Sequence, residues 1–322
     1  MGSCHRKLEL RPGPLLAALL LGAGARCLAG EQAPGAAAAA ESAPVVRELR
    51  YRLSAAVRPL LLFWIRTNNV GGARILWRSG GDGRRGYELL IGSDPRRAPY
   101  RLNHWGWWRE DAGPEGAQIQ GLKTEEESPS DARAAKARDG RDSFLYKAIR
   151  SRAVGDEVRA ENTVWRLPRD YTYHDLGELL SLIAGPAPEP PRVREARVPE
   201  GTRPGVLSAV TDLVDEAVAA ATGPSRRLLS NRSLCYSFNA ALYDLWLIST
   251  EWLDSARFDG RRYERLVRLT FEVRDRKTKS KDHFALVCAT EGPLAGKPVH
   301  MQSQPNWWFK VEGVLDDSEV FP

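Results

Sequence analysis

The sequence predicts an α+β fold that is mainly β: a curved antiparallel sheet or half-barrel with a few packed helices from a central insertion. Apolar and polar residues alternate strictly from Val267 to Arg274, which is the pattern of a strand with one buried face. Similar short segments fill both ends of the chain and are joined by hairpin-length turns. Helical spacing is confined to the middle. Such a succession favours a meander that curls upon itself.

Composition places the chain among ordinary globular proteins. Of its 322 residues, 43% are hydrophobic and 27% are charged, which excludes collagen, coiled coils and wholesale disorder. No apolar run approaches the roughly 20 residues that a membrane-spanning helix needs. We therefore expect no transmembrane segment in the mature chain.

Residues 1–29 have the three-part pattern of a secretory signal peptide. A basic start precedes an apolar stretch at 15–25, and Cys27 and Ala29 place small side chains at the −3 and −1 positions of a signal-peptidase site. We expect cleavage after Ala29 and export to the periplasm or the extracellular space; an uncleaved anchor is the alternative. Residues 30–44, rich in Ala, Pro and Gly, predict a flexible leader.

Cleavage changes the net charge. The whole chain carries +6, but residues 1–29 hold four Lys or Arg and one Glu, so +3 remains on the mature chain. This small excess is a weak argument for binding nucleic acid, and we expect no nucleic-acid partner.

Two of the four cysteines, Cys235 and Cys288, remain after cleavage. In an oxidising compartment they are candidates for one disulfide bond. The alternative is two small buried apolar side chains. The sequence alone does not place their Cα atoms within the roughly 4.4–6.8 Å that a disulfide requires.

The mature chain divides into two β segments around an irregular, helical middle. Residues 45–109 form the N-terminal β segment and residues 235–322 the C-terminal one, which completes the sheet. The middle, 110–234, begins with a polar loop at 110–142 and contains a Pro-rich linker at 186–204.

Individual elements follow from local patterns. Asn68-Asn69 predicts a hairpin turn. Residues 143–152 favour a short helix, and 157–167 return to strand-like alternation. Thr172 is a candidate cap for a helix over 173–183. The clearest helix spans 206–221, because its apolar residues lie on one face.

Catalytic and metal-binding motifs are scarce. The sequence has no P-loop, no G-x-S-x-G elbow, no H-E-x-x-H and no C-x-x-C. Among the histidines, His283 and His300 lie on neighbouring expected strands, where a surface role is more common than a metal site. Ser93-Asp94-Pro95 is explained best as a turn. We expect no cofactor and no metal.

The strongest local signal is two tryptophan clusters, and the chain has ten Trp in all. The first cluster is Trp105, Trp107 and Trp108; the second is Trp307 and Trp308. One interpretation is that these rings fill the open end of a barrel, because Trp buries a large area. The other is an apolar cleft lined by both clusters. Its polar groups would come from Asn103, His104, Gln302, Gln304 and Asn306.

Three short segments carry a family resemblance: Glu48–Leu53, Val70–Ile75 and Leu294–Val299. They are similar to segments of uncharacterised exported bacterial proteins that contain a domain of unknown function. That resemblance implies an export signal followed by a curved, open β-barrel-like sheet in a cell-envelope setting. It covers about half of the mature chain at its two ends, and it implies no catalytic residues.

These observations favour an exported, non-enzymatic envelope protein that binds an apolar or amphipathic, lipid-like ligand. Two alternatives remain. One is an exported hydrolase of cell-wall or polysaccharide material, with acid–base residues drawn from Asp94, Glu110, His104 and His300. The other is an envelope assembly factor that holds a partner through the basic hairpin tip at 276–281.

Overall fold

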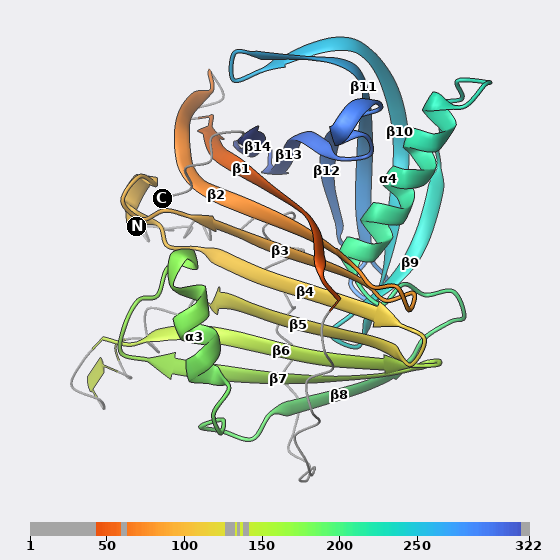
Figure 1. Cartoon of the computed structure of the whole chain (residues 1–322). Helices are drawn as coiled ribbons and strands as arrows, with labels where there is room; N and C mark the ends of the chain where they lie inside the picture. Colours follow the sequence, from red (N-terminus) through yellow and green to blue (C-terminus); the bar gives the residue numbers. More distant parts are fainter. Residues whose placement is uncertain (1–42, 59–62, 126–132, 134–135, 138–141, 317–322) are drawn as a thin grey trace, which may run out of the picture.

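The computed structural model describes residues 43–58, 63–125, 133, 136–137 and 142–316. The expected signal peptide and nearly all of the expected leader lie outside these residues. The described strands form one 14-stranded antiparallel sheet, in the order β8-β7-β6-β5-β4-β3-β2-β1-β14-β13-β12-β11-β10-β9 (Figure 1). The predicted class, a mainly β fold with an open curved sheet, is confirmed.

Neighbours in the sheet are mostly consecutive in the chain, so the sheet is a meander. The strands are β1 (Val45–Val57), β2 (Ile65–Ser79), β3 (Arg85–Ser93), β4 (Trp105–Gly113), β5 (Gly116–Glu125), β6 (Phe144–Val154), β7 (Glu157–Leu167), β8 (Arg192–Arg197), β9 (Arg232–Phe238), β10 (Ala241–Phe258), β11 (Arg261–Asp275), β12 (Lys281–Ala289), β13 (Pro298–Asn306) and β14 (Phe309–Asp316).

The two ends of the chain join through β1 and β14. These strands pair antiparallel from Arg50 opposite Asp316 to Val57 opposite Phe309. This is the one long-range strand pairing of the sheet, and it makes the front and back of the chain a single layer. Strands β1 and β14 each have a neighbour on both sides, so neither presents unpaired backbone groups along this stretch.

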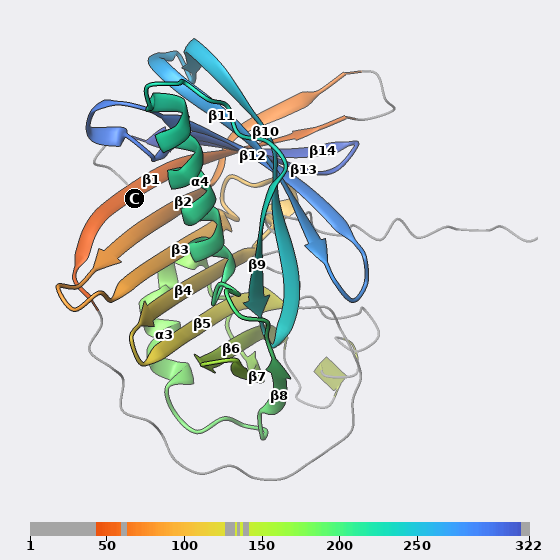
Figure 2. The same ribbon diagram turned by 90° about the vertical axis from the view of Figure 1, so that its right-hand side faces the viewer.

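The layer is bent, and helix α4 (Val206–Thr222) lies inside the bend (Figure 2). The helix contacts β9, β10 and β11 and also β3, which is far from them in the strand order. Trp108 of β4 packs against Phe238 of β9 with ring centroids 5.1 Å apart. Near the two ends of the sheet, Asn162 Nδ2 donates to Asn239 Oδ1 at 2.6 Å. The part of the sheet that contains β3–β7 and the part that contains β9–β11 therefore contact each other, as in an open barrel.

The opposite face of the sheet carries a second core. The 3-10 helix η3 (Tyr173–Asp175) and helix α3 (Leu176–Ile183) cover buried side chains of β4, β5 and β6. Gly92 permits this close approach, because a Cβ there would lie 2.5 Å from the Cβ of Trp105 and 2.9 Å from the Tyr173 ring. No helix among the described residues is long and apolar enough to cross a membrane.

Helix predictions at 173–183 and 206–221 are confirmed by η3–α3 and α4. Thr172 takes part at the expected position, since its backbone N–H and its hydroxyl both donate to Asp175 Oδ2 at 2.8 Å. The stretch 157–167 is strand β7, also as predicted.

The middle of the chain contains more strand than its pattern predicts. Residues 143–152 fall largely in β6, and the expected loop at 110–142 includes the end of β4 and all of β5. Its remainder, apart from 133, 136–137 and 142, lies outside the described residues. The expected linker at 186–204 contributes strand β8, which pairs with β7. Strands β5 and β6 are covered on both faces, and such strands lose the apolar–polar alternation that identifies them. Strand β8 has no buried residue, so its pattern carries no apolar signal.

Asn69 has the positive φ that its sequence pattern indicates, but the hairpin turn predicted there is wrong. Its φ of 56° lies inside β2, where the pairing with β1 shifts register between Leu53 and Ala55. The residue forms a β-bulge instead of a hairpin turn, and bulges bend the strand that carries them. A two-residue turn with positive φ at both positions, 52° at Asn239 and 54° at Ala240, occurs in a different hairpin, between β9 and β10.

Candidate functional site: the cavity beneath helix α4

The first tryptophan cluster divides between the two faces of β4. Trp105 and Trp107 lie in the core under η3 and α3, whereas Trp108 lies in the core that contains α4. All three are buried, with at most 5% of their surface exposed. Trp107 Nε1 donates to Glu88 Oε1 at 3.0 Å, and Trp108 Nε1 has no partner among the described residues.

The second cluster lies elsewhere. Trp307 and Trp308 form the turn between β13 and β14, and Trp307 is 58% exposed. The strands β3, β2 and β1 separate this hairpin from β4. Gln302 is half-buried and Gln304 is exposed, and the side chain of Asn306 lies outside the described part. The structure therefore does not bring the two clusters into one cleft.

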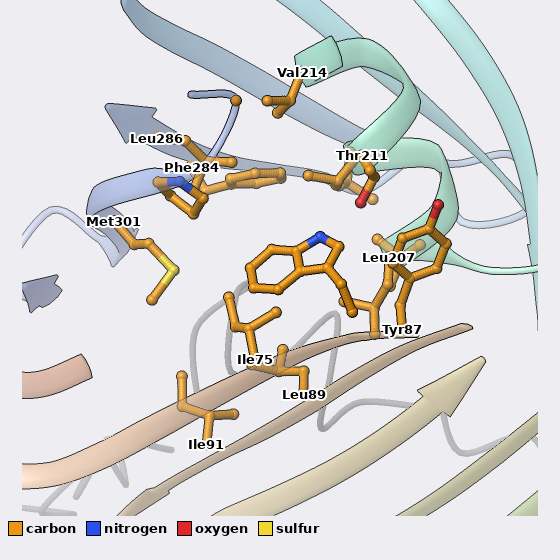
Figure 3. Close-up of a pocket in the computed structure, with 16 residues that line it drawn as sticks. Ile75, Tyr87, Leu89, Ile91, Leu207, Thr211, Val214, Phe284, Leu286 and Met301 are labelled. Atoms are coloured by element: carbon orange, nitrogen blue, oxygen red, sulfur yellow. The ribbon is translucent and has the colours of Figure 1, made fainter. Parts of the chain in front are cut away.

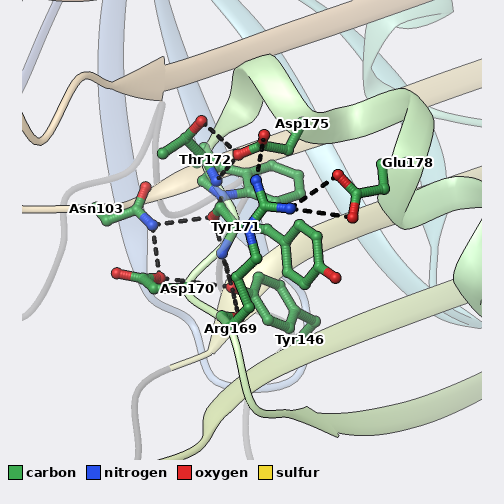
Figure 4. Close-up of polar contacts among 9 residues, drawn as sticks. Asn103, Tyr146, Arg169, Asp170, Tyr171, Thr172, Asp175 and Glu178 are labelled. Carbon is green, nitrogen blue, oxygen red and sulfur yellow. Dashed lines mark hydrogen bonds and ion pairs between the residues drawn. The ribbon is translucent and has the colours of Figure 1, made fainter.

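Asn103 and His104 precede β4 and are held by backbone and side-chain contacts. Asn103 Nδ2 donates to Asp170 Oδ1 at 2.6 Å and to the carbonyl of Tyr171 at 2.9 Å (Figure 4). The His104 backbone N–H donates to Ser93 Oγ at 2.9 Å. Trp105 Nε1 donates to the same Tyr171 carbonyl at 2.8 Å.

Charged side chains around Tyr171 complete this network (Figure 4). The Arg169 guanidinium donates to Asp175 at 2.9 Å and to both carboxylate oxygens of Glu178, at 2.9 and 3.0 Å. Because Arg169 is half-exposed, each ion pair contributes little to stability. Together, the contacts attach η3 and α3 to the sheet, which is a structural role.

The two cysteines are free thiols. Cys235 is in β9 and Cys288 in β12, with β10 and β11 between them, so about 14 Å separates the strands at 4.7–4.9 Å per step. This exceeds the reach of a disulfide bond. The disulfide considered from the sequence is therefore not formed, and the buried Cys288 fits the alternative of a small apolar side chain.

A labelling experiment tests this arrangement. We expect iodoacetamide to label Cys235 in the native protein and Cys288 only after unfolding. Cys288 is fully buried, and burial raises the pKa of its thiol, so the reactive thiolate is scarce. Peptide mapping by mass spectrometry identifies the labelled sites. Native labelling of Cys288, or a disulfide-linked 235–288 peptide from unreduced protein, would contradict the structure.

An apolar cavity lies between helix α4 and the inner face of the sheet (Figure 3), with a volume of about 110 Å³. Its walls come from β2, β3, α4, β11, β12 and β13. The lining residues are Ile75, Trp77, Tyr87, Leu89, Ile91, Val206, Leu207, Val210, Thr211, Val214, Val273, Phe284, Leu286, Gly296, Pro298 and Met301.

Strand and helix periodicity both aim apolar side chains into this space. Ile75 pairs with Leu89 and Trp77 with Tyr87, so these four residues share the inner face of β2 and β3. On α4, the spacing of three and four residues from Leu207 to Val214 places one stripe opposite them. Val214, Leu89 and Ile91 are buried, whereas Trp77 and Val210 are among the half-buried lining residues, so the cavity's open side, its mouth, is assigned to the half-buried part of the lining.

A buried carboxylate anchors the helix that roofs the cavity. Glu110 of β4 accepts the backbone N–H of Leu207 at 2.8 Å and that of Ser208 at 2.9 Å, both in the first turn of α4. Such a contact satisfies two of the donors that every helix leaves unpaired at its start. Burial nevertheless raises the pKa of Glu110 to about 7, and the two backbone hydrogen bonds oppose this shift.

The geometry does not support the acid–base pair considered from the sequence. Glu110 pairs with Tyr87, and Asp94 follows Tyr87 by seven residues along the same direction, or about 23 Å at 3.3 Å per residue. Glycosidase carboxylates lie about 5–10 Å apart. His300 is buried and stacked on Phe258 at 4.3 Å, and burial lowers its pKa to about 4.

The other candidate groups are held in internal pairs. His283 Nε2 lies 2.8 Å from Glu272 Oε2, and no cluster of three potential metal ligands occurs among the described residues. In the basic tip at 276–281, Arg276 pairs with Asp244 at 2.6 Å and Lys281 with Glu272 at 3.5 Å. Part of the tip's charge is therefore already neutralised within the protein.

Sequence patterns predict the walls of the cavity but not the cavity itself. The strands of Trp77 and Tyr87 and the apolar face of α4 were all expected. The cavity exists because helix α4 does not pack fully against the sheet. This spacing depends on how β11–β13 curve around the helix, and no local sequence pattern encodes that curvature. The role of Glu110 was missed for the same reason, because Leu207 is 97 residues further along the chain.

Fold and site together define a mainly β protein whose open, barrel-like sheet encloses one helix and an apolar cavity. No family model and no curated protein matches the chain. It is similar to the crystal structure of a β-barrel-like protein of domain of unknown function DUF1849 from Brucella abortus, with a TM-score of 0.35 and 9% identity over 86% of this chain and 98% of that chain. The predicted resemblance to an uncharacterised β-barrel-like protein is confirmed, and it transfers no function.

Proposed function

We propose that this chain is an exported, non-enzymatic envelope protein that binds an apolar or amphipathic, lipid-like molecule in the cavity beneath α4. The observation that carries the proposal is the cavity itself: an apolar space of about 110 Å³ that is open at the mouth and roofed by an anchored helix. Export rests on the signal-peptide pattern of residues 1–29.

The chemistry of the lining supports an apolar occupant. Of its sixteen residues, only Trp77, Tyr87 and Thr211 carry polar side-chain N or O atoms. The hydroxyls of Tyr87 and Thr211 lie on the same side of the labelled residues (Figure 3). Water needs two to four polar partners to be stable in a cavity, so such a space favours a hydrocarbon over water. Each methylene that leaves water for it contributes about 0.8 kcal/mol.

Ligand-dependent melting tests the proposal. We expect straight-chain alcohols and fatty acids of increasing length to raise Tm and to change Trp fluorescence, because Trp77 lines the cavity. At a free concentration of 100 times Kd, a ligand that binds only the folded state stabilises it by about 2.7 kcal/mol. If no compound of the series changed either signal, the proposed function would fail.

A plug at the mouth gives the matched test. Val210→Phe adds bulk at a half-buried position that faces the cavity, so we expect it to abolish the ligand-induced rise in Tm while the protein stays folded. Val154→Phe, at a half-exposed position near the end of β6, is the control and should leave the rise unchanged. Undiminished binding by Val210→Phe would place the ligand elsewhere.

A further inference from the structure

One basic side chain stands at the cavity mouth in a fixed position. Lys297 lies between Gly296 and Pro298, which both line the cavity. Its backbone N–H donates to the carbonyl of Leu294 at 2.8 Å, and its own carbonyl accepts from the N–H of Ala289 at 3.1 Å. The Lys297 Nζ lies 4.6 Å from the centroid of the ring of Trp77, which is a half-buried lining residue of the cavity.

The ammonium of Lys297 is half-buried without a direct counter-ion. Among the described residues, no carboxylate lies within 4.0 Å of its Nζ. Burial lowers the pKa of Lys297, and the more distant charge of Asp215 only partly opposes this shift. A desolvated cation held this way is more stable when an anion approaches it.

Two other charged groups near Lys297 act in opposite directions: Arg47 adds to this preference for an anion, and Asp215 opposes it. The guanidinium of Arg47 is attached to the same loop, where it donates to the carbonyl of Pro293 at 2.5 Å, and its charge also disfavours a second cation at Lys297. The Asp215 carboxylate, on α4 beside Gly296, is the opposing group. Arg85 and Asp212 also act on the Asp215 carboxylate, and Asp212 is paired with Arg203. Lys297 and Arg47 are therefore the cations on the side of the cavity formed by the 293–298 loop, and Asp215 is the anion that faces them.

We propose that the ligand of this cavity is a single-chain amphiphile with an anionic headgroup, whose chain enters the cavity and whose headgroup binds the Lys297 ammonium. The inference rests on the proposed function and specifies its ligand class. A lysine ammonium acts as a point charge, so carboxylate and phosphate headgroups both fit, whereas neutral and cationic headgroups do not gain this contact.

The headgroup series separates this inference from the proposed function. Hexanoate, hexyl phosphate, hexan-1-ol and hexyltrimethylammonium share one chain length, short enough for a cavity of about 110 Å³, and differ in charge. We expect calorimetric titration of the wild-type protein to show the two anions binding about tenfold more tightly than hexan-1-ol, and the cation more weakly still. Equal affinities for all four would overturn the inference and leave the proposed function standing; binding of none would overturn both.

Substitutions assign the preference to this residue. Lys297→Met keeps an unbranched apolar side chain and removes the charge, so hexanoate should lose about tenfold in affinity while the affinity for hexan-1-ol is unchanged. Lys297→Arg should retain the preference, and Asp215→Asn should increase it. Lys277→Met, in the exposed turn between β11 and β12, is the control. If Lys297→Met kept the wild-type anion preference, or if Asp215→Asn lowered it, the assignment would be wrong. If Lys297→Met does not fold, the wild-type series and Asp215→Asn test the assignment instead.

Discussion

Trp105→Ala is expected to lower the free energy of unfolding by about 3–5 kcal/mol, the usual range for removing a large buried aromatic side chain. Trp105 has no exposed surface, packs on Tyr146 with ring centroids 6.0 Å apart and donates to the Tyr171 carbonyl. The substitution leaves a cavity under η3 and also leaves that carbonyl with one donor fewer. Urea unfolding monitored by circular dichroism measures the loss.

Trp307→Ala is the matched comparison, because the same residue type is removed from a turn where it is 58% exposed. We expect its effect to stay within about 0.5 kcal/mol. The two values together decide whether the first cluster is core and the second is surface. Similar losses at both positions, or a small loss at Trp105, would refute the burial that the structure assigns.

The ends of the chain could be predicted from sequence because their strands have one wet face. From Val267 to Arg274 the alternation is unbroken, and β11 follows it at every position except Glu272, which is buried. The face of α4 could be predicted for a similar reason, since one stripe is buried and the other is solvated. In both cases a local period reports directly on burial.

The middle strands could not be predicted because cores cover both of their faces. In β6, Tyr146 and Ala148 lie under α3, whereas the adjacent Ile149 faces the core that contains α4. Two buried faces erase the period of two, and the remaining pattern of Phe144, Ala148 and Ile149 has helical spacing. Only the pairing of β6 with β5 and β7 resolves the ambiguity.

The same argument explains the candidate site. Three Trp within four residues predict that both faces of β4 need a cover, and the structure supplies two covers, α3 and α4. The sequence-based hypothesis of a shared cleft required both clusters to line one space. The strand register separates the two clusters. Trp105 lies opposite Gly92 of β3, under η3, and the Trp307 turn extends beyond the far end of β1.

Replacement of Glu110 by Gln is expected to remove a large part of the pH dependence of stability. The pKa of Glu110 is raised from 4.5 to about 7 in the folded protein, so between these values the folded state binds a proton that the unfolded state has released. Stability therefore falls as pH rises through this window, by about 3 kcal/mol in total, and is constant above it. Glu110→Gln lacks the titration, so its stability relative to wild type should increase by that amount from pH 4.5 to 8.

Glu110→Ala separates charge from hydrogen bonding at this position. It also removes the titration, but it leaves the N–H groups of Leu207 and Ser208 without their acceptor, at a cost of about 1–3 kcal/mol for each group that stays buried. The free energy of unfolding, measured at pH 4.5, 6 and 8, should therefore depend on pH in the same way for the two variants. Glu110→Ala should be the less stable variant at each pH. If wild type and Glu110→Gln followed the same pH profile, the carboxyl would titrate below this window. Helix α4 would then be held on β4 by an ionised Glu110 carboxylate at neutral pH. In the arrangement that we expect, the same carboxyl group is half-protonated near neutral pH.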